Sequence, residues 1–592
     1  MPELPEMAEL PAMREGRATG ESKATGEAGA GRRFSRRQVV AGAAAVGAGA
    51  VLAGPVGRAA ADGGTGTGAG TGAGAGAPGV FGPLTVRPSD RRYADLARGA
   101  NRRWTGTPDA VRLVGSADQV LAAVQEAVDT GRKPAVRSGG HCYEDFVTSD
   151  DVRLVIDTSF LDGVGYDPAR RGFFIEPGAR LGDAYRALYK GWGVTVPGGT
   201  CPTVGAGGHI VGGGYGALSR LHGLVVDHLY GIEAVVVDAN GTARKVFATR
   251  EENDPLRELL WAHTGAGGGS LGVVTRYWMR SPGAGGGTGA GGGTGAGAAD
   301  PAGLLPQPPS ELLVSTVSWP WEGMTEAAFC TILRNYGRWC ERNSAPGSPY
   351  ASLFSQLKPA HRSAGSFSMT TQIDASVPGA AGLLDAFLAE VGRGAGVAYR
   401  VDDRRTIPWL HATTSWPGFT APDTTMRFKA KSAYMRKGFP EDQLKAFYRH
   451  LSRGDFAGPM SLVMISAYGG RVNAVGAGDT AVPQRDSVMK LHYVTFWQEA
   501  ADDARHLAWI REFYQDVYAA SGGVPRPGDV TDGCFVNYAD ADLNEARWNG
   551  SGVPWNELYF KGNYRRLQAA KARWDPRDVF RHAQSVRLPG GP

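Results

Sequence analysis

The stretch GGTCPTVGAGGHIVGGGYG, from Gly198 to Gly216, alternates glycines with residues that can do chemistry, among them Cys201 and His209. Glycine has no Cβ, so such a chain lets backbone N–H groups approach a ligand closely, and successive N–H groups in turns form anion-binding nests. The stretches RSGGHCYEDF, from Arg137 to Phe146, and HTGAGGGSLGVVT, from His263 to Thr275, have the same character. Together these loops predict a site that wraps a pyrophosphate without the strand–turn–helix fingerprint of a dinucleotide-binding fold.

Strand-like and helical patterns alternate on both sides of these loops. AVRLV, KPAVR and DVRLVIDTS are apolar runs typical of strands, and Ser116 to Gln119 has capping-box spacing before a helical pattern. GIEAVVVDANGTARKV predicts a hairpin in which Asn240 and Gly241 form a type I′ turn. Farther on, LLVSTVSW, SFSMTTQID and GPMSLVMISAYGG predict strands, and FPEDQLKAFYRHLSR and ARHLAWIREFYQDVYAAS predict helices. We therefore expect a mixed α and β domain followed by an α+β domain shaped for a substrate.

Residues 1–61 are predicted to form an export signal. Ser35-Arg36-Arg37 precedes a short Ala/Gly-rich apolar run, and Ala59-Ala60-Ala61 offers a small-residue cleavage site, as in twin-arginine signals. The apolar run is shorter than the roughly 20 residues that a membrane span needs, which disfavours the alternative of a permanent anchor. The twin-arginine machinery exports folded proteins, so we expect a secreted protein that takes up any cofactor before export and keeps no stable membrane anchor.

Two glycine-rich runs divide the rest of the chain. Residues 62–83 are predicted to be a linker, and residues 283–303 an insertion between a domain over 84–282 and a domain over 304–529. Lys and Arg outnumber Asp and Glu by 63 − 58 = 5 over 592 residues, which does not indicate a nucleic-acid partner. The five cysteines are too few and too scattered for a disulfide scaffold, and we predict no metal site.

The order of the motifs resembles the berberine bridge enzyme-like family, which belongs to the vanillyl-alcohol oxidase type of flavoproteins. The resemblance rests on Arg137–His141, on the Cys-Pro-Thr-Val-Gly-x-Gly-Gly-His stretch that starts at Cys201, and on CFVNYADADL from Cys534 with a later Lys-x-x-x-Asp-Pro element. It spans about residues 84–592 apart from the insertion. It implies an α+β fold: a two-part FAD-binding domain (84–282), a substrate domain with an antiparallel sheet covered by helices (304–529), and a C-terminal segment (530–592) that returns to the FAD-binding domain.

The resemblance also implies FAD attached twice, through His141 to the flavin 8α-methyl group and through Cys201 to ring carbon 6. An imidazole nitrogen and a thiolate are side chains well able to attack an electron-poor ring. Cys142 is expected to be a bystander, with a rival nucleophile as the alternative. The wider set of cofactor-binding candidates follows the motifs: Arg137, Ser138, Gly139, Gly140, Gly199, Thr200, Val204, Gly205, Gly207, Gly208, His209, Gly212, Tyr215, Gly216, Gly272, Val273, Asn537 and Tyr538.

Four side chains are candidates for catalysis. Tyr538 matches the family's base, which takes a hydroxyl proton from the substrate while the adjoining carbon gives up hydride. Tyr468, His492 and Tyr493 stand where relatives place polar groups facing the substrate, although Tyr468 and Tyr493 could equally be core aromatics. Val204 occupies the place of an oxygen gate, where valine accompanies oxidases.

We therefore expect a secreted FAD oxidase that converts a hydroxyl of a sugar or a glycosylated secondary metabolite to a carbonyl while O2 becomes H2O2. The alternative reaction is oxidative cyclisation or desaturation of an alkaloid-like or polyketide-like metabolite by the same flavin. An inactive binding module is disfavoured because His141, Cys201 and Tyr538 are all present. A nicotinamide dehydrogenase is disfavoured because its fingerprint is missing.

Overall fold

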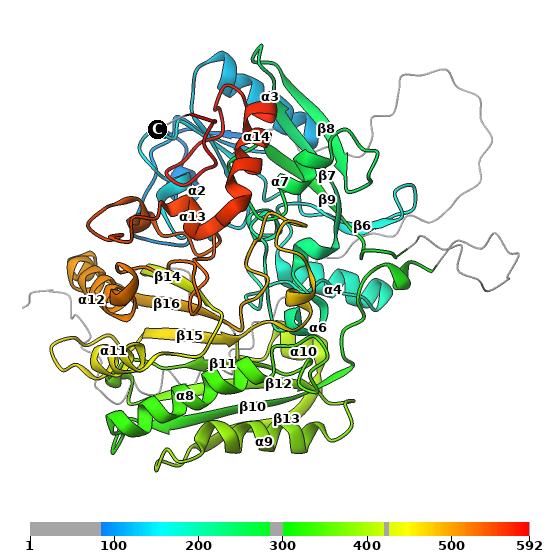
Figure 1. The fold of residues 1–592 in the computed structure, drawn as a ribbon. Helices are drawn as coiled ribbons and strands as arrows, with labels where there is room; N and C mark the ends of the chain where they lie inside the picture. Colours follow the sequence, from blue (N-terminus) through cyan, green and yellow to red (C-terminus); the bar gives the residue numbers. More distant parts are fainter. Residues whose placement is uncertain (1–83, 285–299, 420–425, 591–592) are drawn as a thin grey trace, which may run out of the picture. The chain divides into compact units, whose positions relative to one another are not determined.

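The computed structural model describes residues 84–284, 300–419 and 426–590. The predicted export signal and linker, residues 1–83, and most of the predicted insertion therefore lie outside the described residues. Three sheets organise the described part of the chain (Figure 1). No helix in that part is both long and apolar enough to cross a membrane.

The first sheet has four strands in the order β1-β2-β4-β3, with bounds Leu84–Val86, Ala110–Leu113, Leu154–Asp157 and Pro134–Arg137. The pairs β2–β4 and β4–β3 are parallel, and helix α3 (Ala117–Asp129) supplies the crossover that a parallel arrangement requires. The predicted cap of α3 is confirmed, because the Ser116 hydroxyl accepts a hydrogen bond from the N–H of Gln119 at 3.2 Å. A short helix, α2 (Tyr93–Leu96), lies between β1 and β2 in the sequence.

The second sheet has five antiparallel strands in the order β5-β6-β9-β7-β8, with bounds Val164–Asp167, Gly172–Ile175, Val273–Met279, Leu229–Val237 and Ala243–Thr249. The predicted hairpin is β7–β8, but its turn is not type I′. Only Gly241 has a positive φ, +82°, and its N–H donates to the carbonyl of Asp238 at 3.0 Å. Type I′ needs a positive φ at both central residues, whereas a three-residue loop needs one left-handed glycine.

Four helices between strands β6 and β9 complete the first half of the chain: α4 (Leu181–Trp192), α5 (Ala206–Val211), α6 (Ser219–His222) and α7 (Arg257–Ala262). The C-terminal helix α14 (Tyr564–Trp574) lies beside α7, as Figure 1 shows, and α13 (Trp555–Phe560) precedes it and contacts it. The ammonium of Lys571 fixes this arrangement, since it is fully buried and donates to the carbonyls of Ser270 and Phe580 and to Asp575. The C-terminal segment thus packs on the third glycine-rich loop.

The third sheet has seven antiparallel strands in the order β13-β10-β12-β11-β15-β16-β14. Their bounds are Arg400–Pro408, Glu311–Pro320, Ser366–Asp374, Phe354–Lys358, Ser461–Ala467, Met489–Trp497 and Arg427–Met435. Helices α8 (Glu326–Arg342), α9 (Ala380–Gly392), α11 (Glu441–Ser452) and α12 (Asp503–Val517) cover one face (Figure 1), and α10 (Trp409–Thr414) follows β13. This is the antiparallel sheet with helices on one face that the sequence predicts for the substrate domain.

Candidate active site

Two glycine turns that are distant in the sequence pack backbone to backbone. A Cβ added to Gly139 would lie 2.3 Å from the nitrogen of Gly205, and a Cβ added to Gly205 would lie 2.3 Å from the nitrogen of Gly139. The hydroxyl of Ser138, beside this contact, donates to the carbonyl of Pro177. Neither turn can carry a side chain at the contact, so the two glycines explain why the stretches RSGGH and CPTVG meet.

His141 and Cys201 converge on one hydroxyl. The Nε2 of His141 lies 3.3 Å from the Oγ1 of Thr203, which lies 3.4 Å from the Sγ of Cys201. Burial lowers the pKa of His141, so at neutral pH the imidazole keeps a free lone pair. Burial raises the pKa of the Cys142 thiol to about 12, so that side chain stays protonated and is a poor nucleophile. The interpretation of Cys142 as a bystander is the one that this burial supports.

Tyr538 lies in a second cluster, of aromatic rings around a buried lysine. Its hydroxyl is 3.0 Å from the hydroxyl of Tyr215. The ammonium of Lys490 lies 3.6 Å from the ring centroid of Tyr215, 3.0 Å from that of Phe535 and 5.8 Å from that of Tyr538. Lys490 has no exposed surface and no hydrogen-bond partner among the described residues. A positive charge on Lys490 would therefore be stabilised by these aromatic faces.

Burial acts against charge on both titratable groups of this cluster. It raises the pKa of Tyr538 well above the usual value for a phenol, with Tyr215 and Tyr143 adding to the effect. It lowers the pKa of Lys490 well below the usual value for an amine. Burial therefore disfavours each charge taken singly, whereas a negative charge on Tyr538 and a positive charge on Lys490 would stabilise each other.

His492 and Tyr143 stack on Tyr538. The ring centroids of His492 and Tyr538 are 4.0 Å apart, and Tyr143 lies 5.4 Å from Tyr538 at an angle of 10° between ring planes. The Nε2 of His492 is buried with no hydrogen-bond partner among the described residues, although its neighbours are aromatic. An unpaired buried nitrogen is costly, which indicates that a ligand completes this part of the site. Tyr143 follows His141 by two residues and so joins the two clusters.

The structure does not bring Tyr493 to these groups. Successive strand residues point to opposite faces, so Tyr493 of β16 points away from Lys490 and His492, toward the covering helices. Its hydroxyl is 2.9 Å from that of Tyr518, and its ring stacks on Phe447 of α11. The expectation that Tyr493 faces the substrate is therefore wrong, and its alternative as a core aromatic holds.

Tyr468 lies one layer behind the cluster. Its ring centroid is 6.0 Å from that of Tyr215 and 5.5 Å from the ammonium of Lys490, and it is 1% exposed. Its carbonyl accepts from the buried guanidinium of Arg220. This position packs Tyr468 against the lysine and Tyr215 and separates it from Tyr538.

Three residues predicted to contact the cofactor also have structural roles. The guanidinium of Arg137 is buried and donates to Asp157 at 2.7 Å and to the carbonyls of Leu96 and Arg98. Val273 is 1% exposed and packs in the core beside the second sheet. Gly272 precedes it at φ +146°, and a Cβ there would lie 2.6 Å from the carbonyl of Val235. Arg137 is the last residue of β3 and Val273 the first of β9, so their contacts anchor the ends of the adjoining glycine-rich loops.

The remaining glycines of the central stretch create close packing around His209. The N–H of Gly199 donates to the Nε2 of His209 at 3.0 Å, and a Cβ at Gly214 would strike the same ring. A Cβ at Gly212 would collide with Asn537, whose amide donates to the carbonyl of His209 at 3.1 Å. This contact joins the central stretch to the segment that carries Tyr538.

Other members of the predicted set lie around this packing. A Cβ on Gly216 would collide with the carbonyl of Gly198, and the hydroxyl of Thr200 donates to the carbonyl of Phe419 at 3.3 Å. The N–H of Gly207 donates to the carbonyl of Pro177 at 2.9 Å, whereas a Cβ on Gly208 would have no atom within 4 Å.

Comparison with known proteins identifies this arrangement. A sequence profile described as an FAD binding domain matches residues 108–246, and one described as berberine and berberine like matches residues 534–587. The chain is 50% identical over 568 residues to an aclacinomycin-N/aclacinomycin-A oxidase of Streptomyces galilaeus, covering 94% of this chain and 99% of that protein. The chain belongs to the berberine bridge enzyme-like family. It is an FAD-dependent oxidoreductase of the vanillyl-alcohol oxidase type.

Two further relatives have names that state a substrate. A hexose oxidase of Chondrus crispus is 32% identical over 546 residues, covering 84% of this chain and 93% of that protein. The crystal structure of a glycopeptide hexose oxidase complexed with teicoplanin has a TM-score of 0.79 at 48% identity, covering 86% of this chain and 99% of that chain.

The residues of this berberine bridge enzyme-like protein fit FAD. Gly139 and Gly205 let the turns that carry His141 and Cys201 pack against each other, because neither residue has a side chain. His141 and Cys201 offer two nucleophilic atoms, both within 3.4 Å of the hydroxyl of Thr203, and the unpaired nitrogens of His492 and Lys490 offer polar contacts. These nucleophilic and polar atoms suit the flavin ring, which has polar atoms along its edges.

Sequence reasoning missed a row of polar side chains on the face of the third sheet opposite the covering helices. Gln356, Ser466 and Lys490 are direct partners across β11, β15 and β16, so their side chains share one face. The amide of Gln356 donates to the hydroxyl of Ser466 at 3.2 Å. Lys358 lies two residues farther along β11, and burial lowers its pKa to about 8. The alternation of polar and apolar residues in FSQLK indicates that Gln356 and Lys358 share one face of the strand. It does not show which face of the sheet is turned toward the glycine-rich loops.

Proposed function

We propose that this protein is an oxidase that holds FAD covalently through His141 and Cys201 and oxidises a hydroxyl of a sugar or of a glycosylated secondary metabolite to a carbonyl. The observation that carries the proposal is the convergence of His141 and Cys201 on the hydroxyl of Thr203. Tyr143, two residues after His141, stacks on Tyr538 and so places this pair near the proposed base. The similarity to the sugar and glycoside oxidases named above supports the substrate class.

The bound flavin would supply the acceptor for a hydride, and oxygen would then take the electrons as hydrogen peroxide. Tyr538 takes the proton of the substrate hydroxyl. For this step Tyr538 must be a phenolate, which becomes a neutral phenol as it accepts the proton. Before the transfer, Tyr215 donates a hydrogen bond to the Tyr538 oxygen, and a positive charge on Lys490 would stabilise the phenolate through the ring of Tyr215. His492 donates or accepts at its unpaired Nε2 and orients the substrate. The polar row of Gln356 and Ser466 extends this surface for further hydroxyl groups.

The covalent attachment is tested by acid precipitation of the purified protein. We expect the precipitate to keep its yellow colour, and His141→Ala and Cys201→Ala each to leave one linkage, found by mass spectrometry of flavin-bearing peptides. A flavin that is washed out of the wild-type protein would show that these two residues do not hold it.

The substrate class is tested by incubating the enzyme with a panel of sugars and glycosides while hydrogen peroxide is measured. Peroxide formed together with a new carbonyl supports the proposal. A new ring or double bond in a non-glycosylated metabolite, with no reaction on any glycoside, would instead support cyclisation or desaturation.

Export as a folded holoenzyme is part of the same proposal and rests on Ser35-Arg36-Arg37. Changing Arg36 and Arg37 together to lysine should hold the protein inside the cell, measured by immunoblot of cell and medium fractions. Undiminished secretion of that double variant would rule out the twin-arginine route.

A further inference from the structure

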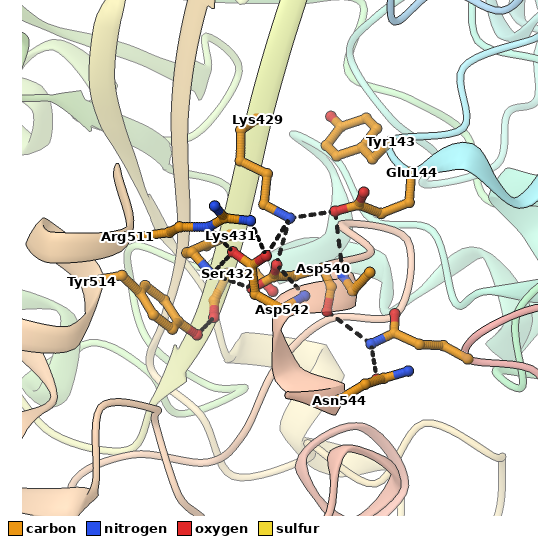
Figure 2. Close-up of polar contacts among 12 residues, drawn as sticks. Tyr143, Glu144, Lys429, Lys431, Ser432, Arg511, Tyr514, Asp540, Asp542 and Asn544 are labelled. Atoms are coloured by element: carbon orange, nitrogen blue, oxygen red, sulfur yellow. Dashed lines mark hydrogen bonds and ion pairs between the residues drawn. The ribbon is translucent and has the colours of Figure 1, made fainter. Parts of the chain in front are cut away.

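Six ionisable side chains from four separate segments form one buried network, called here the Lys429 network (Figure 2). The segments are the loop after His141, strand β14, helix α12 and the loop after Tyr538. Five of the six side chains are at most 4% exposed, and Arg511 is 20% exposed. The members are Glu144, Lys429, Lys431, Arg511, Asp540 and Asp542.

Lys429 is the central link of the network. Its ammonium lies 2.5 Å from a carboxylate oxygen of Glu144 and 2.7 Å from one of Asp540. The same oxygen of Glu144 accepts the N–H of Ala541 at 3.2 Å. Glu144 therefore contacts the 538–542 loop directly through the backbone and indirectly through Lys429.

Lys431 and Arg511 complete the charge balance. Lys431 donates to Asp540 at 2.7 Å and to Asp542 at 2.8 Å, and Arg511 lies 2.7 Å from Asp542. Three cations thus meet three carboxylates. Such a buried set has little net effect on stability, because desolvation of the charges offsets their attraction, but breaking one pair is strongly unfavourable. Its geometry is consequently well defined.

The network joins the two loops that carry the proposed chemistry. Glu144 follows His141 by three residues, and Asp540 follows Tyr538 by two. Between them, Tyr143 stacks on Tyr538. We propose that Glu144 and Lys429 are positioning residues, which hold the His141 loop against the Tyr538 loop so that the flavin attachment and the catalytic base are in register. This inference rests on the roles proposed above for His141 and Tyr538.

A purely stabilising role is distinguished by a charge-balanced double variant. Glu144→Gln keeps the shape and the acceptor for Ala541 but removes a charge, and Lys429→Met removes the opposite charge. If the pair only balances charge, the double variant should regain what each single variant loses. If the pair holds the loops in register, the double variant should stay as defective as the single ones, since the link is missing in all three.

The matched control is Arg427→Met on the same strand. Arg427 precedes Lys429 by two residues and pairs with Asp503 of α12, and it contacts neither loop. It therefore removes an ion pair between β14 and α12 without touching the proposed link.

The first measurement is the ratio of His141-linked to Cys201-linked flavin in peptides of each purified holoenzyme. We expect the His141-linked fraction to fall by about half or more in Glu144→Gln, in Lys429→Met and in the double variant, while the Cys201-linked fraction and the Arg427→Met control stay near wild type. An unchanged ratio in Glu144→Gln, which is nearly isosteric and should fold, would overturn the inference. So would recovery of the ratio in the double variant.

The second measurement is hydrogen exchange of the same holoenzymes. We expect peptides covering 138–146 and 534–542 to exchange about tenfold faster in Glu144→Gln while α8 and β10 are unchanged. The rate of flavin reduction by substrate should fall up to about 10²-fold with substrate affinity within about twofold. Uniform acceleration over the whole chain, or none, would overturn the inference. A wild-type protein without flavin on His141 would contradict the proposed function, whereas normal attachment in wild type and all variants would contradict the inference alone.

Discussion

At the scale of single residues, the base assignment gives the most direct test. Tyr538→Phe keeps the ring stacked on His492 but removes the hydroxyl that faces Tyr215. Because a positioned general base typically contributes 10²- to 10⁴-fold, we expect anaerobic flavin reduction to slow by about that factor with flavin content unchanged. Tyr493→Phe is the control, since its hydroxyl lies on the opposite face and pairs with Tyr518. Reduction of the Tyr538→Phe protein within about threefold of wild type would place the base elsewhere.

A second residue-scale prediction concerns pH. Burial raises the pKa of Tyr538, and only the deprotonated phenol can act as a base, so flavin reduction should accelerate as pH rises into the alkaline range. Lys490→Met removes the amine that can take up a positive charge against the ring of Tyr215 when Tyr538 ionises, which should shift this rise to higher pH. Stopped-flow reduction rates between about pH 6 and 10 measure both profiles. Coinciding profiles for the two proteins would show that Lys490 does not act on the base.

Val204 supports a third prediction at this scale. It is half-buried, its N–H donates to the carbonyl of Cys201 at 3.3 Å, and its carbonyl accepts from Leu181. Val204→Ile adds a methyl group beside the proposed attachment site. We expect slower reoxidation of reduced enzyme by oxygen in stopped-flow experiments, with reduction by substrate largely unchanged. Equal reoxidation rates in the wild-type and Val204→Ile proteins would show that Val204 does not control the access of oxygen.

At the scale of elements, the contact between two glycine turns is a prediction about assembly. In Gly205→Ala the new Cβ would overlap Gly139, so the turns must separate, at a cost of about 1–3 kcal/mol in the free energy of unfolding. We expect lower flavin incorporation and a lower melting temperature. Gly191→Ala in helix α4 is the control, because a Cβ there meets no atom within 4 Å. A Gly205→Ala protein with wild-type flavin content would show that this close contact between the two turns is not needed for flavin incorporation.

The same scale shows what the sequence could predict. Local signals sufficed where the pattern is local, as for the Ser116 cap and for helices α11 and α12. The family resemblance predicted that His141 and Cys201 share one site, because both motifs are intact in the sequence. In the structure both side chains lie beside the hydroxyl of Thr203. Strand β13 was missed because RVDDRRTIP is an exposed edge strand without apolar alternation.

Other features could not be predicted because they depend on distant contacts. His492 and Tyr493 are neighbours in one strand, so they could not both face the substrate, and the sequence does not say which of the two would. Lysines in RFKAKSAYM look like surface residues, yet Lys429 and Lys431 are buried against carboxylates more than 100 residues away in the chain. Only the fold brings these charges together.

At the scale of the whole molecule, buried histidines should make the protein sensitive to acid. Burial lowers the pKa of His209, His222, His263 and His506 to about 4. Each is neutral in the folded protein and, in the unfolded chain, gains a proton as pH falls through its usual value of about 6.5. The unfolded state therefore binds more protons, and stability should fall as pH drops from about 7 toward 4.

His263 isolates this effect because it lies on the loop after α7 and is 5% exposed, with its Nδ1 on the carbonyl of Leu259 at 2.8 Å. His263→Gln removes one titrating group, so the free energy of unfolding should change less steeply with pH, by up to about 1.4 kcal/mol per pH unit between pH 6.5 and 5. Urea unfolding of the holoenzymes across that range measures the slope, and carboxylates with ordinary pKa values stay largely ionised within it. If both proteins lose stability at the same rate between pH 6.5 and 5, protonation of His263 is not part of the acid response.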